Sequence, residues 1–232
     1  MTPLNLPGGN RRYLQIARKL AAAIDGGRYA AGERLPPERE LAQLLDVSRT
    51  TVREALLALE LMRFIEIRVG AGVFVLDEKL RSRSDMAEPD VAAPSDVLAA
   101  RRIVEAETAA LAAANATEEQ IDTMRRANER MAGAVDDIAA FDAADARFHE
   151  LIAEAACNDV LSGFVDHLWR MRNSPMWAFW YDQTRHPDNR RQSVEDHRRV
   201  LRAVERRSPD SARTAMQVHL DTLADRFYEL KL

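Results

Sequence analysis

Between residues 96 and 230, apolar residues recur at the three- and four-residue spacing of amphipathic helices, and no segment alternates in the manner of a strand. Alanine and leucine fill many of these apolar positions. The pattern excludes a sheet-based domain in this region and predicts an all-α helical bundle. We expect six main helices, over residues 96–115, 117–132, 137–156, 158–172, 189–206 and 209–230.

The pattern is different before residue 77. Helices are predicted over 13–24, 37–45 and 48–62, and the alternating stretch 64–76, which turns at Gly-Ala-Gly, predicts a β-hairpin. Two short helices joined by a tight turn and followed by a hairpin are the layout of a winged helix-turn-helix. The fold class is therefore mostly α, with an N-terminal winged helix-turn-helix and a C-terminal all-α bundle.

Three parts follow from these patterns. A winged helix-turn-helix domain occupies residues 1–76, a linker occupies 77–95, and an all-helical domain occupies 96–232. The linker lacks periodicity and mixes charge with proline. The first 80 residues carry a net charge of +2 and the remainder −6, which is compatible with a nucleic-acid-binding head on an acidic body.

The sequence carries no sign of a membrane or secretory protein. No apolar run approaches the roughly 20 residues that span a bilayer, and the N-terminus lacks the apolar core of a signal peptide. The single cysteine, Cys157, cannot form an internal disulfide, which suggests a reducing compartment. We expect a cytoplasmic protein with no membrane partner.

The candidate DNA-binding side chains of the N-terminal domain lie at the start of the third predicted helix. Ser48 is the expected N-cap, and Arg49, Thr50, Thr51 and Arg53 crowd the first turns. Arginine can bind guanine bidentately in the major groove, and threonine hydroxyls suit phosphate oxygens. The alternative is a solvated helix with scattered arginines. The ordered set, together with the predicted wing, favours binding to double-stranded operator DNA.

The segments GERLPPERELAQLLDVSRTTVREALLALE and GAGVFV resemble the GntR family of bacterial transcription regulators, over about residues 11–76. The resemblance implies a set of DNA contacts: Arg39, Arg49, Thr50, Thr51, Arg53 and, at the wing tip, Gly70. Asp46 and Arg63 stand where the family often has glycine. An aspartate can adopt the left-handed conformation at modest cost, so the predicted fold is not affected.

An aspartate and a histidine, Asp145 and His149, lie on one apolar face of the helix predicted over 137–156, and His197 and His219 lie on apolar faces of two later helices. A single histidine of this kind is usually a satisfied core residue. Three histidines with an aspartate four residues before one of them also suit a divalent metal such as Zn²⁺, Ni²⁺ or Mn²⁺. The residues alone leave both interpretations open.

Four segments, RRIVEAETAALAA, DARFHELIAEA, VEDHRRVLRAV and AMQVHL, resemble helices of the FCD effector-binding domain of the FadR-type GntR branch. The resemblance implies that Asp145, His149, His197 and His219 together bind one divalent ion, with zinc the first choice and nickel or manganese as alternatives. It also places Arg101 beside the cavity, where a guanidinium would bind a carboxylate. The alternative for Arg101 is a surface ion pair with Glu105, and Arg102 is a less favoured substitute.

All three tryptophans lie in LWRMRNSPMWAFWY, residues 168–181. Trp169 is on the helix predicted over 158–172, and the other two lie in the less regular stretch 171–189, which is expected to hold at most a short helix. Core packing is one explanation. The segment also resembles one in GntR regulators of hexuronate catabolism, which indicates a hexuronate or aldonate as the small carboxylate effector.

These observations predict a homodimeric transcription regulator, a repressor that the effector releases from its operator. Two alternatives remain at this point. The Asp/His cluster could serve a metal-dependent hydrolase or lyase, although the sequence offers no obvious second general base and the DNA-binding head would then be unexplained. Alternatively, the helical domain could serve only for dimerisation.

Overall fold

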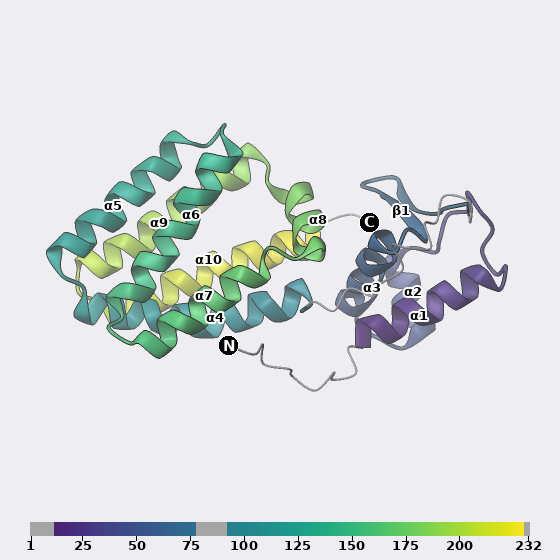
Figure 1. Ribbon diagram of the computed structural model, residues 1–232, viewed down its shortest axis with the longest axis horizontal. Coiled ribbons are helices and arrows are strands. Elements are labelled where there is room, and N and C mark those ends of the chain that lie inside the picture. Colours follow the sequence, from purple (N-terminus) through teal and green to yellow (C-terminus); the bar gives the residue numbers. More distant parts are fainter. Residues whose placement is uncertain (1–11, 78–91, 230–232) are drawn as a thin grey trace. The chain divides into compact units, whose positions relative to one another are not determined.

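A computed structural model of the chain describes residues 12–77 and 92–229. The described residues form ten helices and one two-stranded sheet, which confirms the mostly α fold class (Figure 1). The chain divides into two compact units at Ala93–Pro94. Most of the predicted linker lies outside the described residues. No helix among the described residues is long and apolar enough to cross a membrane.

The N-terminal unit is a helix-turn-helix with a hairpin. Helices α1 and α2 pack against α3, and α3 leads into the hairpin β1–β2. The strands are antiparallel, with Ile65 opposite Val75 and Ile67 opposite Val73, so one face of the hairpin is buried. The bounds are α1 Arg12–Asp25, α2 Glu38–Leu45, α3 Arg49–Leu61, β1 Ile65–Arg68 and β2 Gly72–Val75.

Local sequence explains the sharp turns of this unit. The Ser48 side chain accepts a hydrogen bond from the backbone of Thr51 and caps α3, as predicted. Asp46 ends α2 in the left-handed conformation with φ 51°, and Arg63 after α3 also has a positive φ, 59°. These are the two positions where glycine was expected from the family pattern. Val69 continues the alternation of Ile65 and Ile67 in the sequence, but it lies in the hairpin turn and is exposed.

The C-terminal unit is a bundle of seven helices. Helices α4 and α6 pack on each other and both contact α7, while α5 packs on α6 and α9. The core contains small residues of α4, such as Ala109, against Phe148 of α6 and Met216 of α10. The bounds are α4 Pro94–Asn115, α5 Glu118–Gly133, α6 Ile138–Ala155, α7 Asp159–Met171, α8 Pro175–Thr184, α9 Pro187–Glu205 and α10 Pro209–Glu229.

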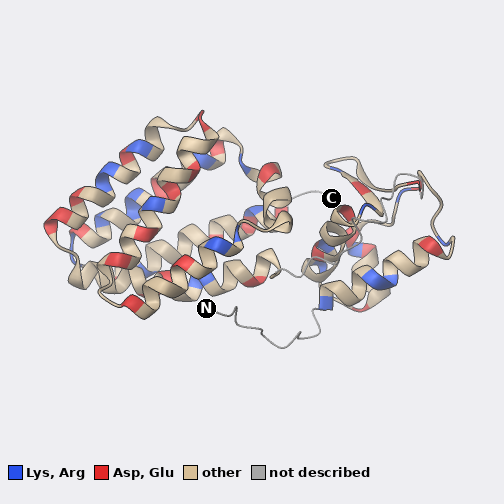
Figure 2. Ribbon diagram, viewed as in Figure 1, with Lys and Arg blue, Asp and Glu red and all other residues tan. Residues whose placement is uncertain are grey.

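The tryptophan-rich stretch contains one short helix, which is as much as the sequence was expected to hold there. Ser174 caps helix α8 and Pro175 occupies its first turn. Trp177 and Trp180 are buried on α8, at one end of the bundle (Figure 1), and Trp180 packs edge-on against Phe227 of α10. The outer helices carry acidic and basic residues mixed along their length, which explains why these faces remain in water (Figure 2).

Candidate DNA-binding and effector sites

Two arginines are exposed close to the helix-turn-helix turn. Arg49 begins α3 with its side chain 63% exposed, and one oxygen of Glu38 accepts a hydrogen bond from its Nε at 3.0 Å. Arg39, in the first turn of α2, is exposed and forms no ion pair with any described residue. Both side chains are therefore available to DNA in the manner that the sequence predicted.

Arg53 lies in a different environment from the one predicted. Its side chain is 3% exposed, and its Nε and Nη2 donate to Oε2 of Glu38 at 3.0 and 2.6 Å. A guanidinium buried in this way is not presented to a base edge, so the prediction of a direct contact needs correction. The Glu38 carboxylate binds Arg49 and Arg53 together and fixes the first two turns of α3 against α2.

The remaining predicted DNA contacts are partly or fully accessible. Thr50 and Thr51 are half-buried, and the Thr51 hydroxyl shares a 2.8 Å hydrogen bond with the hydroxyl of Ser48. Gly70 lies exposed in the wing turn with φ 78°, a conformation that favours glycine. Glu38 was not singled out from the sequence, because an acidic residue in a first helical turn is common.

The predicted metal ligands converge inside the helical domain. Asp145 and His149 come from α6, His197 from α9 and His219 from α10, and all four side chains are buried. Nitrogen atoms of the three histidines lie within 4.8 Å of one another. Oδ1 of Asp145 is 3.3 Å from Nε2 of His197 and 3.9 Å from Nε2 of His149. Residues on three helices thus meet at one point.

Outer hydrogen bonds orient two of the rings. The Nδ1–H of His149 donates to Glu105, and the Nδ1–H of His197 donates to the carbonyl of Ser193 at 2.6 Å. In its neutral form, a ring with this hydrogen bond carries its lone pair on Nε2, and the Nε2 atoms of His149 and His197 are only 2.9 Å apart. Two lone pairs at this distance repel unless a proton or a cation lies between them.

Burial favours the neutral form of two of the rings, His197 and His219, and nearby cations favour the ionised form of Asp145. Burial and the neighbouring His219 lower the pKa of His197 well below its ordinary value, and burial also lowers the pKa of His219. Burial alone would raise the pKa of Asp145, but attraction to His197 and His149 when they are protonated, and to the permanent charge of Arg172, outweighs burial and holds that pKa low. Neutral imidazoles beside an ionised carboxylate are the protonation states that metal ions require.

The third histidine also has a carboxylate in its outer shell. Nδ1 of His219 lies 3.8 Å from Oδ2 of Asp196, and within the described chain neither atom has a hydrogen-bond partner. The other oxygen of Asp196 accepts hydrogen bonds from Gln192 and Arg199. Carboxylates beside ligand histidines are usual in metal sites, where they fix the ring orientation. Neither Glu105 nor Asp196 was predicted from sequence as part of the site.

Arg101 lies next to this cluster. The pair with Glu105 exists, with Nε 2.5 Å from Oε1, but both side chains are 1% exposed. The alternative of a surface pair is therefore wrong. The Nη1 group of Arg101 is buried and has no hydrogen-bond partner among the described residues. Arg102 points elsewhere and pairs with Asp221 of α10, with both side chains half-exposed.

Comparison with known proteins agrees with this architecture. The family model for bacterial regulatory proteins of the gntR family matches residues 12–75, and the FCD domain model matches residues 96–222. The Uxu operon transcriptional regulator of Escherichia coli K12 is 36% identical over 225 residues, which cover 94% of this chain and 88% of that protein. The chain belongs to the GntR family.

A second relative and a solved structure also match most of this GntR-family chain. The Exu regulon transcriptional regulator of Escherichia coli K12 is 32% identical over 91% of this chain and 82% of that protein. The solved structure of McbR/YncC from Escherichia coli shares the fold, with a TM-score of 0.53, 21% identity and coverage of 94% and 97% of the two chains. The Uxu and Exu relatives are transcriptional regulators, so the chain is a DNA-binding regulator and not the hydrolase or lyase considered above.

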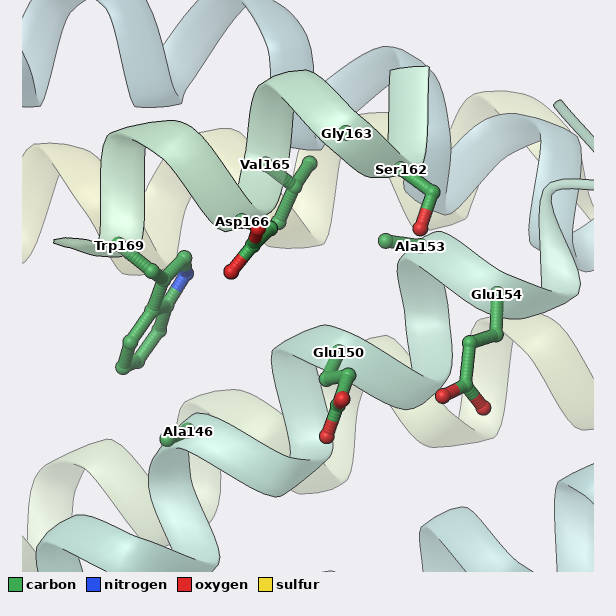
Figure 3. A pocket seen from close by; sticks show the side chains of 9 residues that line it. All are labelled: Ala146, Glu150, Ala153, Glu154, Ser162, Gly163, Val165, Asp166 and Trp169. Atoms are coloured by element: carbon green, nitrogen blue, oxygen red, sulfur yellow. The ribbon is translucent and has the colours of Figure 1, made fainter. Parts of the chain in front are cut away.

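A groove with a volume of about 370 Å³ lies between α6 and α7 of the FCD domain. Figure 3 shows Trp169 and Asp166 from α7 and Glu150 from α6 around it. Its charged lining is acidic, which disfavours a carboxylate ligand. The ring of Trp169 also lies 4.9 Å from the ring of His149, so this one indole borders both the groove and the histidine cluster.

Proposed function

We propose that this GntR-family regulator is a homodimeric repressor whose FCD domain holds one divalent metal ion and binds a small carboxylate, which weakens operator binding. The single observation that supports the metal most is the pair of Nε2 atoms 2.9 Å apart on rings whose Nδ1–H groups are already engaged. Histidine ligands lie about 2.0–2.1 Å from zinc, so two such nitrogens fit one ion.

Four residues would hold the ion: Asp145, His149, His197 and His219. Three imidazoles with one carboxylate suit zinc, and nickel or manganese are alternatives. A divalent ion bound there would supply positive charge that attracts the carboxylate of the effector. Arg101 would bind the same carboxylate through its unpartnered Nη1 group.

The class of effector rests on two similarities. The relatives named above regulate the Uxu operon and the Exu regulon, and the tryptophan-rich segment resembles one in hexuronate regulators. We therefore propose a hexuronate or a related aldonate. Its hydroxyl groups would also suit the buried indole N–H groups of Trp169, Trp177 and Trp180, which have no partner among the described residues.

In the head, the proposal assigns DNA contacts to Arg39, Arg49, Thr50 and Thr51 and to the wing at Gly70. Arg53 is assigned a positioning role through Glu38. Two such heads in a homodimer would bind a palindromic operator, each with α3 in the major groove. The regulator would act in the cytoplasm, where bacterial operator DNA is found.

Operator binding with and without the acid tests this proposal. The zinc-loaded protein is titrated onto labelled operator DNA, and fluorescence anisotropy is recorded across a panel of hexuronates and aldonates. We expect one of these acids to weaken binding by about 5–150-fold, a usual range for coupling between two sites. Sedimentation on the same samples checks the dimer. The absence of any effect, together with a response to an amino acid or a fatty acyl ligand, would refute the sugar-acid assignment.

A further inference from the structure

A second buried arginine lies beside the histidine cluster, at the C-terminal end of α7. The side chain of Arg172 is 11% exposed. Its guanidinium carbon lies 3.9 Å from the ring centre of Trp169, with the rings of Trp177 and Tyr181 at 5.4 and 5.7 Å. Aromatic rings on several sides remove water from a group that carries a permanent charge.

The hydrogen bonding of Arg172 is far below its capacity. A guanidinium has five N–H donors. The only side-chain hydrogen bond of Arg172 within the described residues joins Nη1 to Oδ2 of Asp145 at 3.4 Å, which is long for a charge-assisted bond. Asp145 is also one of the four proposed metal ligands, so its negative charge would be shared between Arg172 and the ion. A buried charge with one long bond is costly unless another group satisfies it.

Arg101, on α4, contacts the same tryptophan ring as Arg172. Its guanidinium carbon lies 4.6 Å from the ring centre of Trp169, the same ring that Arg172 contacts. Arg101 also has an unpartnered Nη1. Two cations with spare donors therefore meet at one indole, in an environment where like charges repel strongly. An anion or a group rich in oxygen acceptors would relieve this repulsion.

We propose that Arg172 is a second effector-binding residue and determines specificity for polyhydroxy acids. The inference rests on the proposed function, in which Arg101 and the metal receive the carboxylate. Arg172 donates to the oxygens farther along the ligand, the ring or chain hydroxyls of a sugar acid, while Trp169 lies against its carbon skeleton. A simple monocarboxylate such as acetate reaches Arg101 but offers nothing to Arg172.

A structural role for Arg172 is the competing explanation, since the residue joins α7 to α6 through Asp145. The two roles differ in what a substitution changes. A structural tether affects stability and all ligands alike, whereas a specificity residue changes the ratio of two affinities. Arg170 provides a matched control, because it lies on the same helix and pairs with Asp166 at 2.7 Å but is 66% exposed.

The experiment uses the full-length protein loaded with excess zinc, with metal content checked for every variant. Dissociation constants for glucuronate, galacturonate and acetate are measured by calorimetry, with competition for the weak ligand. We expect Arg172→Gln to weaken sugar-acid binding by about tenfold or more, the loss of a charged hydrogen bond, and to leave acetate unchanged. Arg172→Lys should change the ratio of the sugar-acid and acetate dissociation constants less than Arg172→Gln does. Arg170→Gln should bind all three acids as the parent does.

Each other outcome counts against the inference in a distinguishable way. If the ratio of the dissociation constants for sugar acid and acetate is unchanged in both Arg172 variants, the inference is overturned while the proposed function stands. The same holds if an Arg172 variant cannot be loaded with metal, because the role of Arg172 would then be to position Asp145. If the parent protein binds neither sugar acid, the proposed effector class fails and this inference falls with it.

Discussion

The two units of this regulator place their functional side chains in opposite ways. In the winged head the buried charges are paired, as Arg53 and Glu38 are, and the unpaired cations, such as Arg39, are on the surface. In the FCD domain, polar side-chain atoms without a hydrogen-bond partner among the described residues lie in the interior. All the buried side-chain nitrogen and oxygen atoms found without a partner in the described residues belong to this domain, and none belongs to residues 12–77.

This difference shows which kind of partner each unit is suited to bind. A DNA-binding head contacts its partner across its surface, so its interior can be fully satisfied before binding. A domain that encloses a small ligand needs polar groups that the protein does not pair, because the ligand pairs them. A buried donor without a partner among the described residues, such as Nη1 of Arg101, is costly by itself. In the proposed function, the carboxylate of the effector pairs this group.

The largest effect should come from breaking the interior of the FCD domain. The combined substitution His197→Ala and His219→Ala removes two of three imidazoles, so the variant should lose the divalent ion that we expect at about one per chain. Elemental analysis after purification without chelator measures it. His167→Ala, at an exposed position on α7, is the control and should keep the ion. A parent protein that neither contains nor takes up metal would contradict the prediction.

Removing the buried pair of the head should have the next largest effect. Arg53→Ala leaves the Glu38 carboxylate buried with only Arg49, and breaking a buried ion pair in this way costs about 3 kcal/mol. We expect faster hydrogen exchange in α2 and α3, recorded by mass spectrometry, with α5 unchanged. If exchange is unaltered but operator binding is lost, Arg53 reads DNA directly and the positioning role is wrong.

Arg49 should behave in the opposite way to Arg53. Its exposed guanidinium can reach a base edge, and the loss of a bidentate contact costs about 1–3 kcal/mol of binding. Arg49→Ala should therefore weaken operator binding, measured by gel shift, without changing hydrogen exchange in the head. Lys19→Ala on the exposed face of α1 is the control. Binding as tight as that of the parent would remove Arg49 from the interface.

Arg101 should connect the two units functionally. Arg101→Gln removes the charged group proposed to bind the carboxylate, so the variant should bind operator DNA as the parent does but lose most of the effector response, about 1–3 kcal/mol of coupling. Anisotropy titrations with and without the acid test this. Arg102→Gln, at the neighbouring half-exposed position, is the control. An undiminished response would show that Arg101 serves only Glu105 and His149.

The smallest effect is expected at the turn of the helix-turn-helix. Asp46 has φ 51°, a conformation in which glycine has no side-chain penalty. Asp46→Gly should therefore slow hydrogen exchange of α2 slightly, by an amount equivalent to about 1 kcal/mol or less. Operator affinity should not change. Faster exchange in the variant would indicate that the Asp46 side chain stabilises the turn more than its backbone strain costs.

Sequence periodicity predicted most of this fold, because helix and strand spacing depend on local burial patterns. The predicted helices agree with the observed ones to within a few residues, and Ser48 caps α3 as its position suggested. Helix α8 is the short helix that the irregular stretch was expected to hold at most. One exception has a local reason. Val69 follows the alternating pattern but lies where the hairpin turns.

The sequence by itself determined which residue types are present and on which helical faces they lie, so Asp145 and the three histidines could be selected as candidates. Only the tertiary structure decided which groups surround them. Glu105, Asp196 and Arg172 act across helices that are far apart in sequence, and no local pattern marks such a partner. The same limit applies to Arg53. Its burial and its ion pair with Glu38 depend on how α2 and α3 pack, which the sequence at the start of α3 does not show.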